Sequence, residues 1–333
     1  MLKKKAGGTL LRLIEAGLIA MVLLSLFALA YDNSGIKETN PTGATATHWK
    51  GRQLVSNMTE GFAWFVTDEN GFNNAAVPEQ IDVLLTGDSH MEGAEMPQEK
   101  NVAAVLSRLL DGQTVYNIGI KGNFLNFAVQ NAGNALRAFR PRRAVVLDVS
   151  DNTLYLELED MRAIIAGEKE RVPASFESGP IYYLKLIPCV KPLLYGIRNW
   201  IAFPDYGRTP RPELTEEYLD TLDAFVGVLA HAAGEAGVQP IILFQPNEYI
   251  TPDGAVTYDR DEEYYDAFRA ACEKNGVLLL DLTEDFRALT ESEHIVMHGF
   301  TNTTAGSGHL NENGHRAMAE ALARVLAEAE GEA

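Results

Sequence analysis

One stretch, residues 81–93, constrains the fold of this chain more than any other. It reads Ile-Asp-Val-Leu-Leu-Thr-Gly-Asp-Ser-His-Met-Glu-Gly. Its first half is a short apolar run rich in branched residues, typical of a strand buried on both faces, and the run stops at Gly87. Ser89 is therefore expected at the carboxyl end of a central strand, the edge of an open α/β sheet where catalytic groups collect. A plain strand-ending turn with a helix cap explains the same residues, and this stretch alone does not separate the two.

Alternating strand and helix patterns follow along the chain. Four more strand-like runs occupy residues 114–118, 144–149, 239–244 and 277–282. Helical patterns cover residues 101–110, 124–139, 213–236, 261–274 and 312–328. This alternation predicts right-handed crossovers, so the sequence indicates an α/β fold with one five-stranded parallel sheet and the strand-end loops at one edge.

Composition shifts divide the chain into segments. Residues 1–31 form an N-terminal apolar segment, residues 32–60 are polar and mixed, typical of a tether or an arm leading into the domain, and residues 61–333 are globular. Residues 154–212 interrupt the strand–helix rhythm and are expected to be an insertion, with an aromatic, proline-punctuated part from 181 to 204. The insertion fits a packed subdomain, a lid over the substrate or a contact with the bilayer surface.

The N-terminus has the pattern of an export signal. Lys3–Lys5 precede an apolar stretch from Leu10 to Tyr31 that only Arg12 and Glu15 interrupt. The positive-inside rule keeps such lysines in the cytoplasm and delivers the rest of the chain across the membrane. We expect either a single transmembrane anchor, the preferred interpretation, or a signal peptide cleaved after Ala30.

Charge and cysteine content exclude several classes of protein. The formal net charge of −18 over 333 residues argues against a phosphate-binding surface, so nucleic acid is not an expected partner. Cys189 and Cys272 can form at most one disulfide bridge and no metal cluster. His294 and His298 have metal-ligand spacing for a helix, but the intervening Ile-Val pair argues against a helix. We expect no metal site and no cofactor.

The strand-end loops together resemble the four blocks of the SGNH (GDSL-type) hydrolase family. The blocks correspond, in chain order, to Gly87-Asp88-Ser89, Gly122-Asn123, Asn152 and His309–His315. The resemblance extends from about residue 66 to residue 328 and implies a flavodoxin-like, three-layer α/β/α fold with ester chemistry. An α/β-hydrolase elbow is excluded, because it would need glycine where Met91 stands.

Residue roles follow from the chemistry and from this resemblance. A serine hydroxyl needs a base, and imidazole titrates near neutral pH, so Ser89 and His309 are the expected nucleophile and base. The resemblance places the oxyanion donors at the backbone N–H groups of Ser89 and Gly122 and at the side-chain amide of Asn152. His315 is the less favoured candidate for the base.

The family's acid is missing from its usual place. It normally lies two or three residues before the histidine, where this chain has Ser307 and Gly306. We therefore expect a Ser–His dyad whose imidazole is oriented by a backbone carbonyl, by Ser307 or by a distant acid. Asp281 could be that acid only if the loop folds back. Without a nearby carboxylate, the pKa of His309 is expected to stay near or below about 6.5.

These observations predict a membrane-anchored serine esterase. Its catalytic domain would lie outside the cytoplasm, in the periplasm or at the cell surface, or would be secreted if the N-terminal segment is cleaved. The expected substrate is an acylated cell-envelope or extracellular polysaccharide, inferred from family and location. Two alternatives remain open: an O-acetyltransferase using the same Ser–His chemistry with a membrane acyltransferase as partner, and an inactive glycan-binding or scaffold protein.

Overall fold

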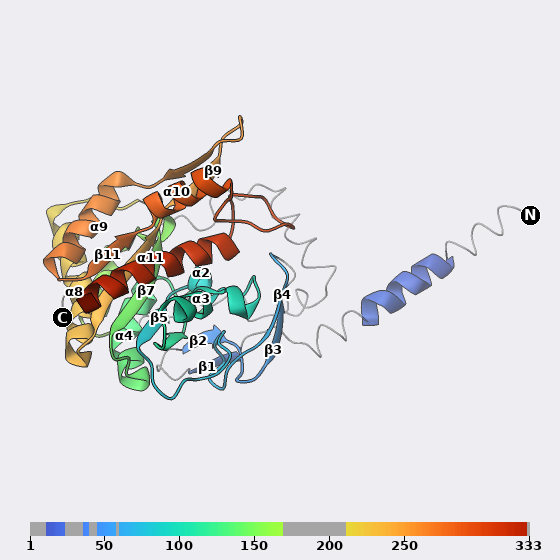
Figure 1. The fold of residues 1–333 in the computed structure, drawn as a ribbon, viewed down its shortest axis with the longest axis horizontal. Coiled ribbons are helices and arrows are strands. Elements are labelled where there is room, and N and C mark those ends of the chain that lie inside the picture. Colours follow the sequence, from blue (N-terminus) through green and yellow to red (C-terminus); the bar gives the residue numbers. More distant parts are fainter. Residues whose placement is uncertain (1–10, 24–35, 40–44, 58–59, 169–210, 332–333) are drawn as a thin grey trace, which may run out of the picture. The chain divides into compact units, whose positions relative to one another are not determined.

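A five-stranded parallel sheet forms the centre of the main domain. The computed structural model describes residues 11–23, 36–39, 45–57, 60–168 and 211–331. The sheet consists of β5 (Val83–Thr86), β6 (Val115–Asn117), β7 (Ala144–Ser150), β8 (Gln239–Gln245) and β11 (Leu278–Asp281), in the order β11-β8-β7-β5-β6 (Figure 1). The predicted α/β fold and parallel sheet are confirmed, and β5 is an interior strand next to the edge strand β6, with Leu85 paired with Val146 on one side and Asn117 on the other.

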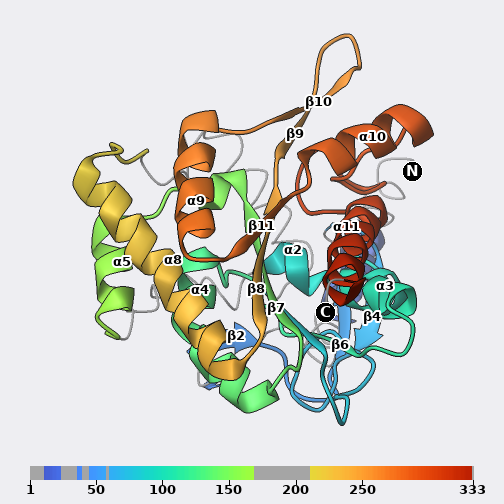
Figure 2. The same cartoon turned by 60° about the vertical axis from the view of Figure 1, so that its left-hand side comes forward.

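Helices cover both faces of this sheet. On one face lie α4 (Leu125–Phe139), α5 (Leu158–Ile165), α8 (Glu216–Ala236) and α9 (Glu262–Lys274), and on the other lie α3 (Val102–Leu109), α10 (Thr283–Glu293) and α11 (Glu312–Gly331) (Figure 2). The apolar faces of these helices form two separate cores. Val83 and Leu85 of β5 point into one core and Leu84 into the other, because successive strand side chains alternate between faces. The result is a three-layer arrangement.

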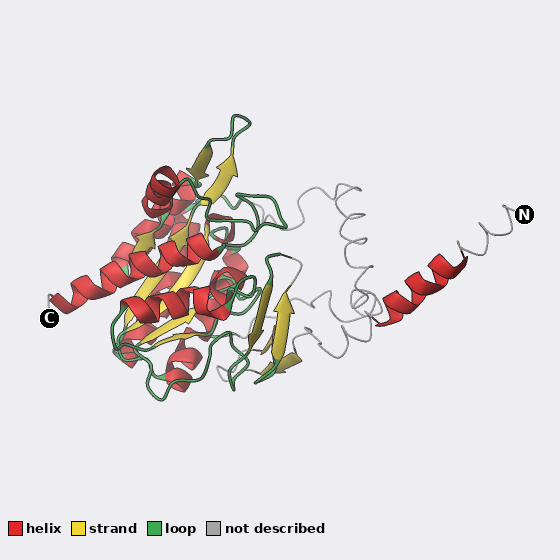
Figure 3. Ribbon diagram, turned by 45° about the vertical axis from the view of Figure 1, so that its right-hand side comes forward, coloured by secondary structure: helices red, strands yellow, loops and turns green. Residues whose placement is uncertain are grey.

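Three antiparallel hairpins and three short helices complete the described structure. The hairpins pair β1 (Ile36–Thr39) with β2 (Thr45–His48), β3 (Leu54–Asn57) with β4 (Ala63–Val66), and β9 (Asn247–Ile250) with β10 (Val256–Asp259) (Figure 3). The short helices are α2 (Ser89–Glu92), η1 (Gln98–Lys100) and η2 (Asp151–Thr153). Within residues 32–60, β3 packs against the main domain, and its Val55 is buried with Ala63 and Phe65 of β4 and with Ala94.

The expected N-terminal and insertion segments are described only in part. Residues 11–23 are helical and belong to a compact unit separate from the main domain. No helix within the described ranges is both long and apolar enough to cross a membrane. Of the expected insertion 154–212, helix α5 belongs to the main domain, while Cys189 and the aromatic part lie outside the described residues. Cys272 is a buried free thiol in α9.

Candidate active site

The turn after β5 presents Ser89 at the start of a short helix. Asp88 is the N-cap of α2, and its carboxylate accepts a 2.8 Å hydrogen bond from the backbone N–H of His90. Gly93 ends the helix in the left-handed conformation. Because Ser89 is the first residue of α2, its backbone N–H has no carbonyl partner within the helix. The serine therefore stands at the carboxyl edge of the sheet, as the sequence predicts.

A buried carboxyl of β7, that of Asp148, accepts a hydrogen bond from this turn. The backbone N–H of Asp88 donates to Oδ1 of Asp148 over 3.2 Å, and the amide of Gln245 donates to Oδ2 over 3.2 Å. Gly87 passes so close to Asp148 that an added Cβ would overlap its Oδ1. Burial, together with the neighbouring Asp88, raises the pKa of Asp148 well above its ordinary value. Gly87 is required here by close packing.

The loop before α11 brings His309 to Ser89, although the two residues lie 220 positions apart. Nε2 of His309 is 2.9 Å from Oγ of Ser89, within hydrogen-bond distance. The His309 ring is a quarter exposed, and it lies beside His90 with ring centroids 5.3 Å apart. The structure thus joins the two residues that the sequence pairs as nucleophile and base.

Glu60 is the acid that the sequence reasoning missed. Its Oε2 lies 2.6 Å from Nδ1 of His309, and its Oε1 accepts the backbone N–H of His309 over 2.7 Å. Both carboxylate oxygens therefore hold the same residue, one through the ring and one through the backbone. With Nδ1 donating to Glu60, Nε2 is left as the acceptor for the serine hydroxyl.

The two groups expected to orient His309 lie elsewhere. Asp281 ends β11, which β8 and β7 separate from β5, and its carboxylate accepts bonds from the backbone N–H and hydroxyl of Thr283 and pairs with Arg260. Ser307 is exposed in the loop before His309. Both predictions are corrected: the orienting carboxylate comes from the turn before β4, close in space but far from the histidine in sequence.

Glu60 also changes the expected titration of the base. Burial alone would raise the pKa of Glu60, but the hydrogen bonds from the His309 ring and backbone outweigh burial and lower it. Burial alone would lower the pKa of His309, yet the hydrogen bond to Glu60 and the nearby charges of Glu95 and Glu60 raise it above 6.5. The expectation of a pKa near or below about 6.5 assumed a neutral partner, and it is wrong for that reason.

The expected oxyanion donors lie at the same sheet edge. Gly122 follows β6 with a positive φ of 79°, and no atom would lie within 4 Å of an added Cβ, so a ligand can approach its backbone. Asn123 donates its side-chain N–H to the carbonyl of Gly87 over 3.2 Å, which ties this loop to the nucleophile turn. Asn152 lies in η2, directly after β7, but its side chain is outside the described part of the structure.

His315, His298 and His294 have structural positions that do not bring them to Ser89 as a base. His315 is fully buried, its Nδ1 accepts the backbone N–H of Val102 over 3.0 Å, and burial lowers its pKa to about 3, so it is not placed to act as the base. His298 pairs through Nδ1 with the buried Glu248 over 2.8 Å. His294 follows α10 as its left-handed C-cap and shares no helix with His298. Within the described ranges, no group of three or more His, Cys, Asp or Glu residues is arranged to hold a metal ion.

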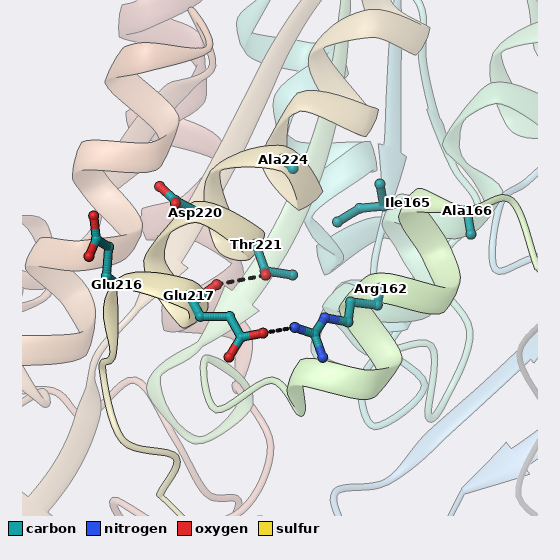
Figure 4. Close-up of a pocket in the computed structure, with 8 residues that line it drawn as sticks. All are labelled: Arg162, Ile165, Ala166, Glu216, Glu217, Asp220, Thr221 and Ala224. Atoms are coloured by element: carbon teal, nitrogen blue, oxygen red, sulfur yellow. Dashed lines mark hydrogen bonds and ion pairs between the residues drawn. The ribbon is translucent and has the colours of Figure 1, made fainter.

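A surface pocket of about 570 Å³ lies away from these residues, between α5 and α8. Figure 4 shows Arg162 and Glu217 facing each other across it, with Glu217 also bonded through its backbone carbonyl to the Thr221 hydroxyl. Its lining includes none of Ser89, His309 and Glu60. The pocket is therefore not assigned to the candidate active site.

Comparison with known proteins finds similarity of fold. No family model and no curated protein matches the chain. A solved acetyl xylan esterase, AlAXEase, is 16% identical, with a TM-score of 0.41 over 74% of this chain and 99% of its own. A member of the lipolytic G-D-S-L family from Veillonella parvula is 14% identical, with a TM-score of 0.38 over 74% and 97%. TesA is likewise 14% identical, with a TM-score of 0.39 over 74% and 97%. The roles of individual residues rest on the geometry described above.

Proposed function

We propose that this protein is a serine esterase of the SGNH type, with Ser89 as nucleophile, His309 as base and Glu60 as acid. The observation that carries the proposal is the chain of two hydrogen bonds, 2.9 Å from Ser89 to His309 and 2.6 Å from His309 to Glu60. A nucleophile bonded to a base, and that base bonded to a carboxylate, is the arrangement that activates a serine for acyl transfer.

The reaction would proceed through an acyl-enzyme. His309 takes the Ser89 proton as Oγ attacks the ester carbonyl, and the imidazolium then protonates the leaving alcohol. Glu60 fixes the ring tautomer and stabilises the positive charge. The backbone N–H groups of Ser89 and Gly122, with the amide of Asn152, would bind the oxyanion, each donor contributing about 3 kcal/mol. Water then releases the acid from Ser89 with His309 as base.

We propose an acylated carbohydrate as the substrate class. Phe62 and Trp64 are 61% and 52% exposed and lie on or next to β4, the strand that begins three residues after Glu60. Exposed aromatic rings two and four residues after the acid in sequence offer apolar faces against which a sugar ring can pack. The Lys3–Lys5 cluster before the apolar N-terminal stretch supports a location outside the cytoplasm, with the N-terminal segment as anchor or cleaved signal.

Hydrolysis of an aryl acetate tests the chemistry. The Ser89→Ala variant should lose activity towards 4-nitrophenyl acetate while its thermal unfolding stays close to that of the parent protein. Activity retained in this variant would exclude Ser89 as nucleophile.

Trp64→Ala tests the substrate class. It should lower kcat/KM for acetylated xylo-oligosaccharides and leave 4-nitrophenyl acetate hydrolysis unchanged, whereas Leu109→Ala, an equally exposed apolar residue on α3, should change neither. Unchanged kcat/KM of Trp64→Ala on the oligosaccharides would refute the proposed contact. Addition of a free sugar acceptor separates the two fates of the acyl group, because transfer would yield an acylated sugar and hydrolysis free acetate.

A further inference from the structure

A second carboxylate lies against the same ring nitrogen that Glu60 holds. Oε1 of Glu95 is 3.9 Å from Nδ1 of His309, and the Glu95 side chain is only 8% exposed. Glu60 precedes the hairpin strand β4, whereas Glu95 follows α2 on the segment that carries Ser89. Two separate parts of the chain thus deliver a carboxylate to one imidazole.

The surroundings of Glu95 do not explain its burial. Its Oε2 is enclosed and has no hydrogen-bond partner, and its Oε1 accepts a long hydrogen bond of 3.4 Å from the amide of Asn57. A buried carboxyl without full hydrogen bonding costs free energy, so this arrangement needs a compensating role. His309 can supply it once the imidazole is protonated, with a weaker contribution from the charge of Lys121.

Close backbone packing keeps the two carboxylates together. Gly61 lies so near the backbone carbonyl of Glu95 that an added Cβ would overlap it. Gly61 also exchanges hydrogen bonds with the side chain of Asn302, donating over 2.9 Å and accepting over 3.2 Å. The turn that bears Glu60 is therefore fixed against the segment that bears Glu95.

We propose that Glu95 is a second positioning residue for His309, sharing the imidazolium charge with Glu60 and taking over Nδ1 when the Glu60 carboxylate is removed. This inference rests on the proposed esterase function. Glu95 needs to approach by only about 1 Å to reach ordinary hydrogen-bond distance from Nδ1. Burial raises the pKa of Glu95, and the charge of His309 opposes that shift, so protonation of the imidazole favours ionisation of this carboxyl.

A double-mutant cycle on activity tests the takeover. Glu60→Ala opens space for Glu95 and should lower kcat for 4-nitrophenyl acetate by roughly 10- to 100-fold. Glu95→Gln alone should lower it by a factor of about three or less. The double variant should lose about 10⁴-fold, which is the loss typical of a triad without its acid. The kcat of the double variant should therefore be at least about tenfold lower than the value expected from multiplying the two single losses.

Glu92 supplies the matched control. It is a buried carboxyl on the same segment, and burial raises its pKa to about 8. Among the described residues, no hydrogen bond joins its carboxyl to the His309 ring. Glu92→Gln combined with Glu60→Ala should give the product of the single effects. If the losses of kcat in Glu60→Ala and Glu95→Gln also simply multiply in the double variant, the proposal is overturned. A Glu60→Ala variant that already shows the full 10⁴-fold loss would overturn it too.

A titration of the ring separates this proposal from the esterase proposal. In the Ser89→Ala background, which needs no turnover, nitrogen NMR should show a lower pKa of His309 after Glu95→Gln, because a nearby negative charge is lost. A purely structural role for Glu95 leaves that pKa unchanged and would refute the inference. If the parent protein is not labelled by a fluorophosphonate, the esterase proposal fails, while the His309 titration still decides the role of Glu95.

Discussion

Asp148 offers a sharp test of how the nucleophile turn is held. Its two carboxyl oxygens accept from the Asp88 N–H and the Gln245 amide, and Oε1 of Gln245 is itself buried without a partner. Asp148→Ala leaves both donors buried and unsatisfied, at about 1–3 kcal/mol each, so the free energy of unfolding should fall by about 2–6 kcal/mol. Asp148→Asn keeps an acceptor for the Asp88 N–H, and its amide N–H can donate to Oε1 of Gln245 once the Gln245 amide turns over, so its cost should stay below about 1 kcal/mol.

The raised pKa of Asp148 also predicts the direction in which stability changes with pH. The folded-state pKa of Asp148 is raised above the ordinary 3.8, so its stabilising contribution is complete below that value and is lost as pH rises towards the folded-state pKa. The amide variant does not titrate. Urea unfolding at pH 5 and pH 8 should therefore show the parent losing stability relative to Asp148→Asn at the higher pH. An Asp148→Asn variant as unstable as Asp148→Ala would mean that the carboxyl is ionised and would refute the reasoning.

Two further predictions concern the base and the nucleophile turn. The pKa of His309 is raised above 6.5, and only the neutral imidazole accepts the serine proton, so kcat/KM should fall on the acid side with a midpoint above 6.5. A pH–rate profile with its midpoint below 6.5 would contradict the assigned role of Glu60. Gly87→Ala should lower both the unfolding temperature and the activity, because the added Cβ overlaps Asp148, whereas Gly234→Ala, with open space around it in α8, should lower neither. Equal behaviour of the two glycine variants in a thermal unfolding assay would exclude the close approach.

The sheet could be predicted because its strands carry an unambiguous signal. The residues of β5 and β7 are buried almost without exception, so each strand appears in the sequence as a largely apolar run between turn residues, interrupted in β7 by Asp148. The nucleophile was recognisable because Ser89 directly follows such a strand, and the base because His309 stands just before the last helical pattern and imidazole is the usual base for a serine. Because Gly122 and Asn152 each follow a strand, they could also be expected at the carboxyl edge of the sheet.

Glu60 could not be predicted, because the sequence around it shows no hydrophobic periodicity. In β4, residues Ala63 and Phe65 are buried while Trp64 and Val66 are exposed, yet all four are apolar, so the alternation that marks a half-buried strand is invisible. Without a visible hairpin, the segment before it fits a tether or an entry arm and gives no sign of an acid. The positions just before the histidine carry no carboxylate, and the tertiary fold supplies one from 249 positions away.

Direct detection of the acyl-enzyme tests the central claim. The protein would be mixed with 4-nitrophenyl acetate, quenched in acid during turnover, digested and examined by mass spectrometry. The account predicts one acetyl group on Ser89, formed in the parent protein and in the Glu60→Ala variant at a lower rate, and absent after His309→Ala. An acetyl group on another residue, or turnover with no covalent acetyl on Ser89, would contradict it.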